Sequence, residues 1–348
     1  MRAAAHHSFP WQHGFAAIDE SMLTVSSSEM ANVWKWKSSV SIPVGLGGSA
    51  FGWIVTPGAT DAILDRFFDI GGRFIDTSDG YSYAARPQAE DSENLIGSWV
   101  KRRGVESEIR IITKVGLCPG VEGLAPTVIA RAAEASLDRL GIPMAEAILA
   151  HADDGVTAPE QIAEGLAALV GSRARHVGVS HFSRERLVAT QAALRHSSSV
   201  TIEFVQEEFS LAERSGIDEL LGCADINRPL GIICSAALAR GFLTGKFQHA
   251  VGRVGARQAF VNEHYRQRAH NELLDRIRRV ADEHEVTPAA ISLRWLLQHD
   301  SVILPLASVT TSAQLDAFTQ AASIEISDAA WQSLDSLSAA LYNNQEDH

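Results

Sequence analysis

The sequence predicts a single α/β domain built as a closed (β/α)8 barrel, and three observations support this fold class. From about residue 44 onward, short β-rich apolar runs alternate with longer segments of helical period. Eight such runs can be counted, each followed by a helical pattern, as expected for a closed barrel of parallel strands. The chain of 348 residues is long enough to bury a substantial core, in one large domain or two modest ones.

The candidate strands and helices follow one another along the chain in regular order. The apolar runs read as strands lie at 44–50, 73–77, 109–114, 145–151, 176–180, 201–206, 231–235 and 302–306. Helical patterns lie at 60–71, 91–103, 126–140, 159–171, 183–196, 216–224, 270–284 and 312–322. A final amphipathic pattern carries Ala330, Leu334, Leu337 and Leu341. We expect this extra C-terminal helix to pack outside the barrel.

Residues that favour helix ends stand near several of these boundaries. Thr60 and Ser183 can cap helix N-termini, because their hydroxyl oxygens can accept hydrogen bonds from backbone N–H groups of the first turn. Gly104 and Gly141 stand where helices should end. Pro288, just after Thr287, fits the first turn of a helix.

The two ends of the chain and one long connection differ from this regular pattern. Residues 1–38 show no sustained hydrophobic period, so we expect a poorly ordered N-terminal extension. The barrel domain is then expected over residues 39–342. The segment 236–269, after the seventh strand, is too long for a routine loop, and insertions of this length are commonly functional.

Composition and charge exclude several classes of protein. The chain is 46% hydrophobic and 21% charged, with a mean hydropathy of -0.01, as in ordinary globular proteins. The sequence has neither an apolar run of eighteen residues nor an export signal, which favours a cytoplasmic location. A net charge of -12 without a clustered Lys/Arg stripe argues against nucleic acid or a membrane as partner. Three widely spaced cysteines do not make a disulfide framework or a Cys-rich zinc site.

Four polar residues fall at the C-terminal ends of predicted strands or in the loops that follow, where a barrel of this kind carries its reactive groups. They are Asp76, Tyr81, Lys114 and His151. Each residue alone has an ordinary structural explanation, because a Lys or Asp at a strand end is often solvated and a lone His is more often structural. Together they form a candidate catalytic set.

The four side chains have complementary chemistry. A phenol has an unperturbed pKa of about 10, which is too high for efficient proton exchange at neutral pH unless a cation favours the phenolate. Lys114 can supply that cation, and Asp76 can hold the ammonium in place. His151 can donate a hydrogen bond to a carbonyl oxygen of a substrate. The set therefore predicts a proton-transferring acid beside a group that stabilises an oxyanion.

Six segments form a pattern along the chain: FIDTSDGY at 74–81, IITK at 111–114, ILAH at 148–151, HVGVSHF at 176–182, VQ at 205–206 and LARGFLTGK at 238–246. In their order and spacing they resemble the aldo-keto reductase superfamily, over about residues 40 to 340. The resemblance implies a TIM-type barrel and an oxidoreductase that transfers a hydride between a nicotinamide cofactor and a carbonyl or alcohol. It also implies that Asp76, Tyr81, Lys114 and His151 are the catalytic tetrad, with Tyr81 as general acid in reduction and as base in oxidation.

The resemblance further implies an extended NAD(P)(H) molecule bound across the barrel mouth without a Rossmann domain. The segment Gly45-Leu-Gly-Gly48 is not the G-x-G-x-x-G fingerprint, which agrees with this expectation. Ser180 and Gln206 occupy positions that hold the carboxamide in the family, and residues 238–246 match the loop around the pyrophosphate. The residues that the resemblance assigns to cofactor contacts are Gly48, Ser180, His181, Gln206, Ser235, Leu238, Arg240, Gly241, Lys246, Ser308 and Gln314.

The chain departs from the family pattern at both ends of the expected cofactor. His181 stands where Asn is usual, and Ser235 stands where an aromatic residue normally stacks on the nicotinamide. At the adenosine end, residues 305–311 lack the usual Lys or Arg, and Gln314 and Phe318 replace Arg and Asn. A site without these cations loses charge-assisted bonds to a 2′-phosphate.

We therefore predict that NADP(H) preference is weakened and that NAD(H) can be the working cofactor. The contrary alternative is that Arg240, Lys246 or Arg253 in the long loop reaches the phosphate instead.

Trp53, just after the first strand, resembles a loop-borne Trp that lines the substrate pocket in a subgroup of the family. The alternative for this side chain is packing over the barrel rim. We expect a small-molecule substrate that is an aldehyde, a ketone or a sugar-like compound, or the corresponding alcohol. A cofactor-binding regulatory or scaffold subunit of the same fold is the second hypothesis. A metal-dependent hydrolase is a third, but the sequence shows no cluster of His and carboxylates and so predicts no metal site.

Overall fold

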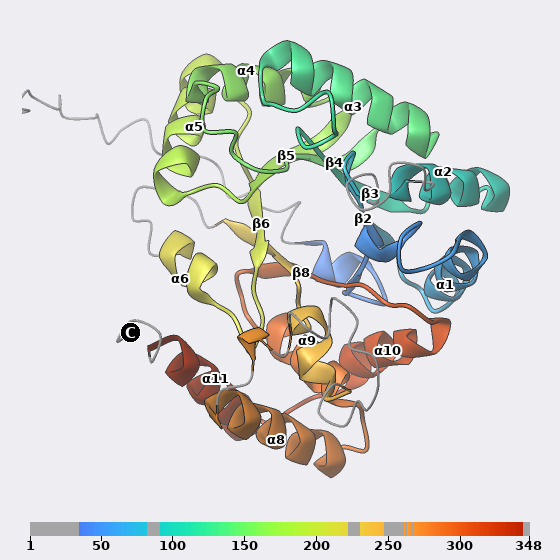
Figure 1. Cartoon of the computed structure of the whole chain (residues 1–348), viewed down its shortest axis with the longest axis vertical. Helices are drawn as coiled ribbons and strands as arrows, with labels where there is room; N and C mark the ends of the chain where they lie inside the picture. Colours follow the sequence, from blue (N-terminus) through green and yellow to red (C-terminus); the bar gives the residue numbers. More distant parts are fainter. Residues whose placement is uncertain are drawn as a thin grey trace, which may run out of the picture.

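The structure is a closed barrel of eight parallel strands surrounded by helices (Figure 1). It is a computed structural model, and it describes residues 35–81, 91–221, 230–246, 261, 263–265 and 268–343. Each strand pairs with the next along the chain, and the last strand pairs back to the first through Leu46 and Ala307. The predicted (β/α)8 TIM-type fold is therefore confirmed.

The strands form close to the predicted apolar runs. They are β1 (Gly45–Gly47), β2 (Phe74–Asp76), β3 (Arg110–Val115), β4 (Ala145–Ala150), β5 (Ala174–Ser180), β6 (Phe204–Glu208), β7 (Gly231–Ser235) and β8 (Val302–Ala307). β1 is shorter than its run of apolar residues, because the chain turns into the short 3-10 helix η4 (Gly48–Ala50). Nearly all strand residues are buried, since the helices cover the outer face and side chains fill the interior.

The helices alternate with the strands and form the outer layer of the molecule. The α-helices are α1 (Pro57–Asp69), α2 (Ser92–Arg103), α3 (Pro126–Leu140), α4 (Pro159–Leu169), α5 (Arg184–Ser197), α6 (Ser215–Leu221), α8 (Arg268–Glu283), α9 (Pro288–Leu297), α10 (Asp316–Ser323) and α11 (Asp328–Asn343). Besides η4, the short 3-10 helices in the described residues are η3 (Lys37–Ser39), η5 (Ala239–Thr244) and η6 (Ser312–Leu315). α11 lies along α8 outside the barrel, as the amphipathic pattern predicted (Figure 1).

Most of the predicted helix ends are present. The side chain of Ser183 caps α5 by accepting from the backbone N–H of Arg186. Gly104 and Gly141 end α2 and α3 in the left-handed conformation, with φ of 68° and 65°. This conformation is easily adopted by glycine, which has no Cβ to clash with the backbone.

The expectation that Thr60 caps α1 is wrong. α1 begins three residues earlier at Pro57, whose fixed φ suits a first helical turn, and Thr56 stands at the N-cap. Thr60 lies within the helix, where its hydroxyl donates to the Thr56 carbonyl at 3.1 Å. Its hydrogen-bonding capacity is thus used inside the first turn rather than before it.

A separate cluster of apolar side chains fills the end of the barrel opposite the C-terminal strand ends. Trp36, 2% exposed, packs against Phe74 and Phe204, with ring centroids 4.9 and 5.4 Å apart. Both partners are the first residues of their strands, so Trp36 closes the floor of the barrel. The next residue, Lys37, donates to the carbonyls of Leu297 and His299 at 3.2 and 3.0 Å.

Two predictions concern segments that the structure describes only in part. Residues 1–34 of the expected N-terminal extension lie outside the described residues, whereas Trp36 and Lys37 contact the barrel. In the long segment after β7, residues 247–260, 262, 266 and 267 also lie outside them. No helix in the described ranges is both long and apolar enough to cross a membrane.

Candidate active site

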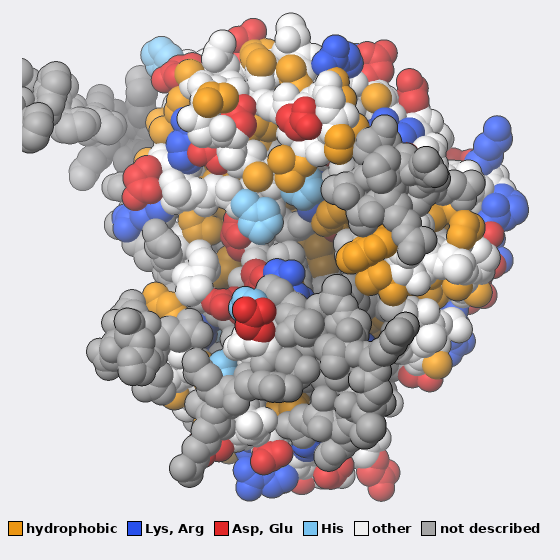
Figure 2. Space-filling model, in the orientation of Figure 1, with side chains coloured by type: hydrophobic (Ala, Val, Ile, Leu, Met, Phe, Trp, Pro, Cys, Tyr) orange, Lys and Arg blue, Asp and Glu red, His pale blue; other side chains and the backbone are white. Residues whose placement is uncertain are grey.

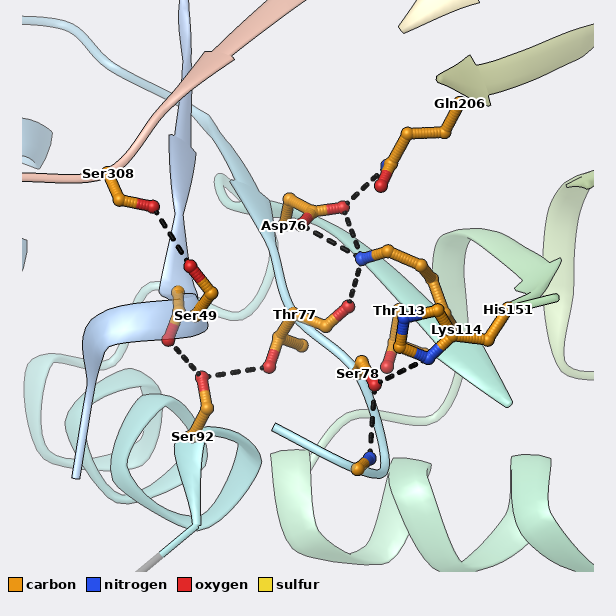
Figure 3. A network of polar contacts seen from close by, with 12 residues as sticks. Ser49, Asp76, Thr77, Ser78, Ser92, Thr113, Lys114, His151, Gln206 and Ser308 are labelled. Atoms are coloured by element: carbon orange, nitrogen blue, oxygen red, sulfur yellow. Dashed lines mark hydrogen bonds and ion pairs between the residues drawn. The ribbon is translucent and has the colours of Figure 1, made fainter. Parts of the chain in front are cut away.

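A buried ion pair lies at the C-terminal end of the barrel strands. Lys114, on β3, places its ammonium nitrogen 2.8 and 2.9 Å from the two carboxylate oxygens of Asp76, the last residue of β2 (Figure 3). The same ammonium donates to the Thr77 carbonyl at 2.7 Å. The side chains of Lys114 and Asp76 are 1% and 4% exposed. Register pairing of the two strands and burial thus fix the pair in one geometry.

Asp76 keeps Lys114 charged despite its burial. Burial alone would lower the pKa of Lys114, because it disfavours the charged form. The Asp76 carboxylate and, after it, the Tyr81 side chain outweigh this effect and raise the pKa of Lys114 above its usual value. The site therefore contains a permanent ammonium at neutral pH.

The ring of Tyr81 lies beside this ammonium. The Lys114 nitrogen is 4.7 Å from the centroid of the phenol ring, and the ring meets that of His151 edge-on at 5.7 Å. Burial is the strongest influence on the phenol and raises its pKa. The charge of Lys114 acts in the opposite direction and is supported by a hydrogen bond. The structure therefore brings Asp76, Lys114, Tyr81 and His151 together, as the strand ends predicted.

His151 follows β4 and is uncharged at neutral pH. Burial lowers the pKa of its imidazole to about 3, and the charges of Lys114 and His181 contribute in the same direction. The ring nitrogen Nδ1 lies 3.0 Å from the hydroxyl of Ser78 (Figure 3). A neutral imidazole has one N–H donor, so it can give a hydrogen bond to a carbonyl oxygen without acting as an acid.

Of the two residues that the resemblance assigns to the carboxamide, Gln206 contacts the ion pair and Ser180 lies beside Gln206. Gln206, on β6, donates through its amide nitrogen to Asp76 at 2.8 Å (Figure 3). Ser180, the last residue of β5, is the register partner of Gln206 on the neighbouring strand. Both residues are buried, at 2% and 1% exposure. Because Gln206 gives its N–H to Asp76, its amide oxygen remains as an acceptor for another group.

His181 follows Ser180 and is held by a carboxylate. Its φ of 51° is in the left-handed region, and its backbone N–H donates to Glu207. The ring nitrogen Nδ1 lies 3.2 Å from the second carboxylate oxygen of Glu207. A hydrogen bond from the His181 ring to the Glu207 carboxylate is the largest influence on the pKa of His181 and raises it above the usual value.

The loop after β7 has an unusual backbone. Ser235 ends the strand half-buried, and Leu238 precedes η5. Within η5, Arg240 and Gly241 have φ of 55° and 100°, so successive residues are left-handed. Such strained backbone persists where the surroundings hold it, and it concentrates at functional sites.

Arg240, Lys246 and Arg253 are the loop residues expected as alternative partners of a phosphate, and the structure describes the first two. Arg240 donates to Glu208 on β6 at 3.0 Å, and both side chains are partly exposed. Lys246 is exposed just beyond η5, and Arg253 lies outside the described residues. The Arg240 guanidinium therefore already interacts with an acidic partner at the barrel mouth.

The expected adenosine end lies where β8 meets β1. The Ser308 hydroxyl lies 3.2 Å from that of Ser49 (Figure 3). Gln314, exposed on η6, accepts from the backbone N–H of Thr310 at 2.7 Å. Phe318, by contrast, is fully buried on α10 and belongs to the core rather than to the mouth.

Gly48 lies against the base of the site. A Cβ at this position would come within 2.9 Å of the Asp76 carbonyl oxygen and 2.7 Å of the Ser92 hydroxyl. No side chain fits there without displacing the backbone of β2. A glycine is thus required for the close approach of η4 to the strand that carries Asp76.

Exposed apolar side chains lie in three of the loops at the barrel mouth. Within the described ranges, the exposed large hydrophobic residues are Trp53, Ile54, Leu117 and Val156. All of them lie in segments that follow β1, β3 or β4, which means that they are on the side of the reactive strand ends. Trp53 is 44% exposed, so part of its surface is accessible to a ligand. Figure 2 shows hydrophobic side chains beside a hollow in this face, next to histidine and acidic groups.

The sequence reasoning did not identify Ser78 and Glu207. Both lie within segments that carry other predicted residues, but their partners are 73 and 26 residues away. Contacts of this kind depend on side-chain direction at the barrel mouth, which no local pattern reports. Among the side chains that the structure describes, no group of three or more His, Cys, Asp or Glu could hold a metal ion.

Comparisons with known proteins agree with this geometry. The profile of the aldo/keto reductase family matches residues 43–339. Aldo-keto reductase yakc (NADP(+)) of Schizosaccharomyces pombe is 30% identical over 78% of this chain and 80% of its own. Norsolorinic acid reductase stcV of Emericella nidulans is 25% identical, over 79% and 70% of the two chains. A probable voltage-gated potassium channel subunit beta of Arabidopsis thaliana is 24% identical, over 73% and 79%. The chain therefore belongs to the aldo/keto reductase family.

Proposed function

We propose that this protein reduces the carbonyl group of a small molecule with NAD(P)H, with Tyr81 as the general acid. The observation that carries this proposal is the Lys114 ammonium, buried against Asp76 and adjacent to the Tyr81 phenol. A structural ion pair needs no phenol beside it. A proton donor of high pKa, however, needs such a cation, because the cation stabilises the phenolate that remains after transfer.

The residues at the barrel mouth fit a nicotinamide dinucleotide. The amide oxygen of Gln206 can accept from a carboxamide, because the nitrogen of the same side chain is held by Asp76. Gly48 fits tightly against β2, so η4 has no side chain at this position that could project toward a bound cofactor. The left-handed residues of η5 change the direction of the backbone in this loop. Successive backbone N–H groups in such a conformation can bind an anion such as a pyrophosphate. When bound, the cofactor supplies the hydride.

The chain itself supplies and stabilises the proton. In reduction, the hydroxyl proton of Tyr81 moves to the carbonyl oxygen of the substrate, and the Lys114 ammonium balances the phenolate. The uncharged imidazole of His151 donates a hydrogen bond to the same oxygen while charge develops there. Asp76 keeps Lys114 protonated throughout. In oxidation the Tyr81 phenolate takes the proton back.

The mouth of the barrel favours aldehydes and ketones with an apolar substituent. A group of exposed apolar side chains can mark a site where a ligand or partner binds, and those in the described residues lie in loops on the side of the reactive strand ends. Trp53 can stack on a flat or apolar part of a substrate whose carbonyl group reaches Tyr81. A sugar-like substrate is the second class of candidate. Its hydroxyl groups need polar partners, whereas the exposed residues described above are apolar.

Cofactor preference follows from the charge of the adenosine end. The segment from β8 through η6 contains neither Lys nor Arg between residues 305 and 314. A 2′-phosphate there lacks the charge-assisted bonds that separate NADPH from NADH. We propose that the chain accepts NADH, although the name of its yeast relative refers to NADP(+).

The direct test is reduction of a carbonyl panel by the purified protein with NADH and with NADPH. Tyr81→Phe removes the transferable proton and should lower kcat at least about a hundredfold for every substrate that is turned over. Tyr342→Phe is the matched control. Tyr342 lies on α11, outside the barrel, so this variant should keep the wild-type rate. Absence of turnover with the whole panel, or full activity of Tyr81→Phe, would overturn the proposal.

A cofactor-binding scaffold subunit is the second candidate, favoured by the similarity to the channel subunit beta of Arabidopsis. In that case the apolar rim would contact a protein rather than a substrate. Cofactor binding without carbonyl reduction would support this alternative. Turnover that depends on Tyr81 would instead support the reductase.

A further inference from the structure

The hydroxyl of Ser78 lies between the catalytic loop and the His151 ring. Ser78 follows β2 and is 1% exposed. Its oxygen accepts from the backbone N–H of Gly80 at 3.0 Å, and it lies 3.0 Å from Nδ1 of His151 (Figure 3). Its backbone carbonyl accepts from the N–H of Tyr81 at 3.3 Å. One residue thus contacts both the turn that carries the phenol and the imidazole.

The direction of each hydrogen bond follows from what the partners can do. A serine hydroxyl has one proton to give and two lone pairs that can accept. The Gly80 amide can only donate, so it uses one lone pair of the Ser78 oxygen. The hydroxyl proton then has Nδ1 of His151 as its acceptor among the contacts given for this group. If Nδ1 carried a proton instead, two N–H groups would point at one oxygen, and the buried hydroxyl proton would lose its acceptor.

We propose that Ser78 is a positioning residue, which donates to Nδ1 of His151 and thereby keeps the single imidazole proton on Nε2. In this tautomer the free N–H of the ring points away from Ser78. A group that polarises a substrate oxygen must present a donor to it, and the other tautomer would present a lone pair, which repels that oxygen. The inference rests on the proposed function, since it assigns how His151 becomes a donor in that reaction.

The contact also couples the two groups that meet the substrate oxygen. The Gly80 and Tyr81 N–H groups both hydrogen-bond to Ser78, so the same residue sets the turn of the phenol loop and the tautomer of the ring. Loss of the hydroxyl should therefore act on the chemical step. It should leave cofactor binding unchanged, because none of the residues that the resemblance assigns to the cofactor contacts the Ser78 side chain in the described structure.

The first test is the protonation pattern of the His151 ring, measured by NMR on the full-length protein with ¹⁵N-labelled histidine. His151→Asn identifies the signal by its disappearance. At pH 7 we expect Nδ1 to appear as an unprotonated nitrogen and Nε2 as a protonated one. In Ser78→Ala the two signals should move toward a mixture of tautomers. A protonated Nδ1 in the wild type, or an unchanged pattern in Ser78→Ala, would overturn the assignment.

The second test separates positioning from folding and from the proposed reaction. With the best carbonyl substrate, Ser78→Ala should lower kcat roughly tenfold, less than the hundredfold expected for removing an oxyanion donor in His151→Ala. The cofactor Kd should stay within twofold. Ser78→Thr restores a hydroxyl and should recover most of kcat. Ser292→Ala deletes a buried hydroxyl that bonds within α9 and should keep the wild-type kcat.

The outcomes distinguish the two proposals. If the wild type reduces no carbonyl compound, the proposed function fails, while the NMR measurement still decides the role of Ser78. If the wild type is active and Ser78→Ala keeps both the tautomer and kcat, the role of Ser78 fails and the reductase proposal stands. Equal loss in Ser78→Ala and Ser292→Ala would show a general effect of removing a buried hydroxyl and would also overturn it.

Discussion

His181 stands at the barrel mouth where the family pattern has Asn. An Asn amide is a donor at every pH, whereas an imidazole has two donors only when it is protonated. Glu207 binds Nδ1 and raises the pKa of His181, which leaves Nε2 as the donor that a carboxamide oxygen can use. We therefore expect the proposed contact of His181 with the carboxamide to depend on pH in this chain.

We predict that NADH binding weakens as pH rises through the pKa of His181, which lies above the usual 6.5. On deprotonation Nδ1 keeps its hydrogen toward Glu207, so Nε2 becomes an acceptor and no longer bonds to the carboxamide oxygen. Loss of one such bond corresponds to about a tenfold increase in Kd. Titrations between pH 6 and pH 9 measure it. His181→Asn should give a Kd that is constant over the same range, and an equal pH dependence in this variant would contradict the prediction.

The residues of the site could be predicted from sequence to the extent that strand ends reveal them. Asp76, Lys114 and His151 end strands or follow them directly, and the barrel topology then brings them together. The bond from Gln206 to Asp76 spans 130 residues, and the contact of Ser78 with His151 spans 73. These contacts depend on rotamers in a crowded mouth, so they needed the structure.

Among the elements, β1 and α9 show where local patterns are insufficient. β1 keeps only three residues of its apolar run, because Gly48, which follows it, allows the chain to turn beside β2. α9 is buried on most of its surface, so its sequence lacks the polar positions that give a helix its period. In the sequence, Thr287 and Pro288 indicate only the start of α9. The Thr287 side chain caps this helix.

The helix η6 offers a direct test of cofactor preference. Gln314 is exposed there and accepts from Thr310, and residues 305–313 before it contain neither Lys nor Arg. Gln314→Arg adds a charge-assisted partner for a 2′-phosphate and should lower the Kd for NADPH about tenfold, leaving NADH unchanged. Gln314→Met, uncharged and of similar length, is the control. A wild-type preference for NADPH above about a hundredfold would contradict the prediction of a weakened phosphate site.

Behind the site, an ion pair with a buried carboxylate joins α2 to α3. Glu93 is 1% exposed in its side chain and binds the Arg139 guanidinium at 2.7 Å, while Thr113 of β3 donates to its other oxygen. Burial raises the pKa of Glu93, and Arg139 is the strongest influence that opposes this. Removing one partner of such a pair leaves a buried charge without compensation.

We predict that Arg139→Met lowers the free energy of unfolding by about 3 kcal/mol at pH 7. Without the guanidinium the pKa of Glu93 rises further, so the folded state favours the protonated acid. Stability of the variant should therefore be greater at pH 5 and be lost as pH rises through that pKa. Urea unfolding at the two pH values measures the difference. Adding Glu93→Gln should recover part of the loss at pH 7, and an additive decrease instead would contradict this account.

At the scale of the whole molecule, the two ends of the barrel have opposite designs. The mouth combines a buried ion pair, two histidines and exposed apolar side chains, whereas aromatic packing fills the floor. Trp36 reaches this floor from the N-terminal side of β1 and contacts the first residues of β2 and β6. Strands on opposite sides of the barrel are thereby joined through one side chain.

Trp36→Ala should therefore destabilise the whole fold while leaving the chemistry at the other end unchanged. A cavity at a fully packed Trp costs about 3–5 kcal/mol, because the strands around it cannot collapse into the space. Trp53→Ala at the mouth is the matched comparison. Its ring is 44% exposed, so its loss should change the free energy of unfolding by about 0.5 kcal/mol or less, while KM for an apolar carbonyl substrate increases. Urea unfolding and steady-state kinetics on both variants measure the two effects. The assignment of floor and mouth is wrong if Trp36→Ala unfolds like the wild type, or if it raises KM as much as Trp53→Ala does.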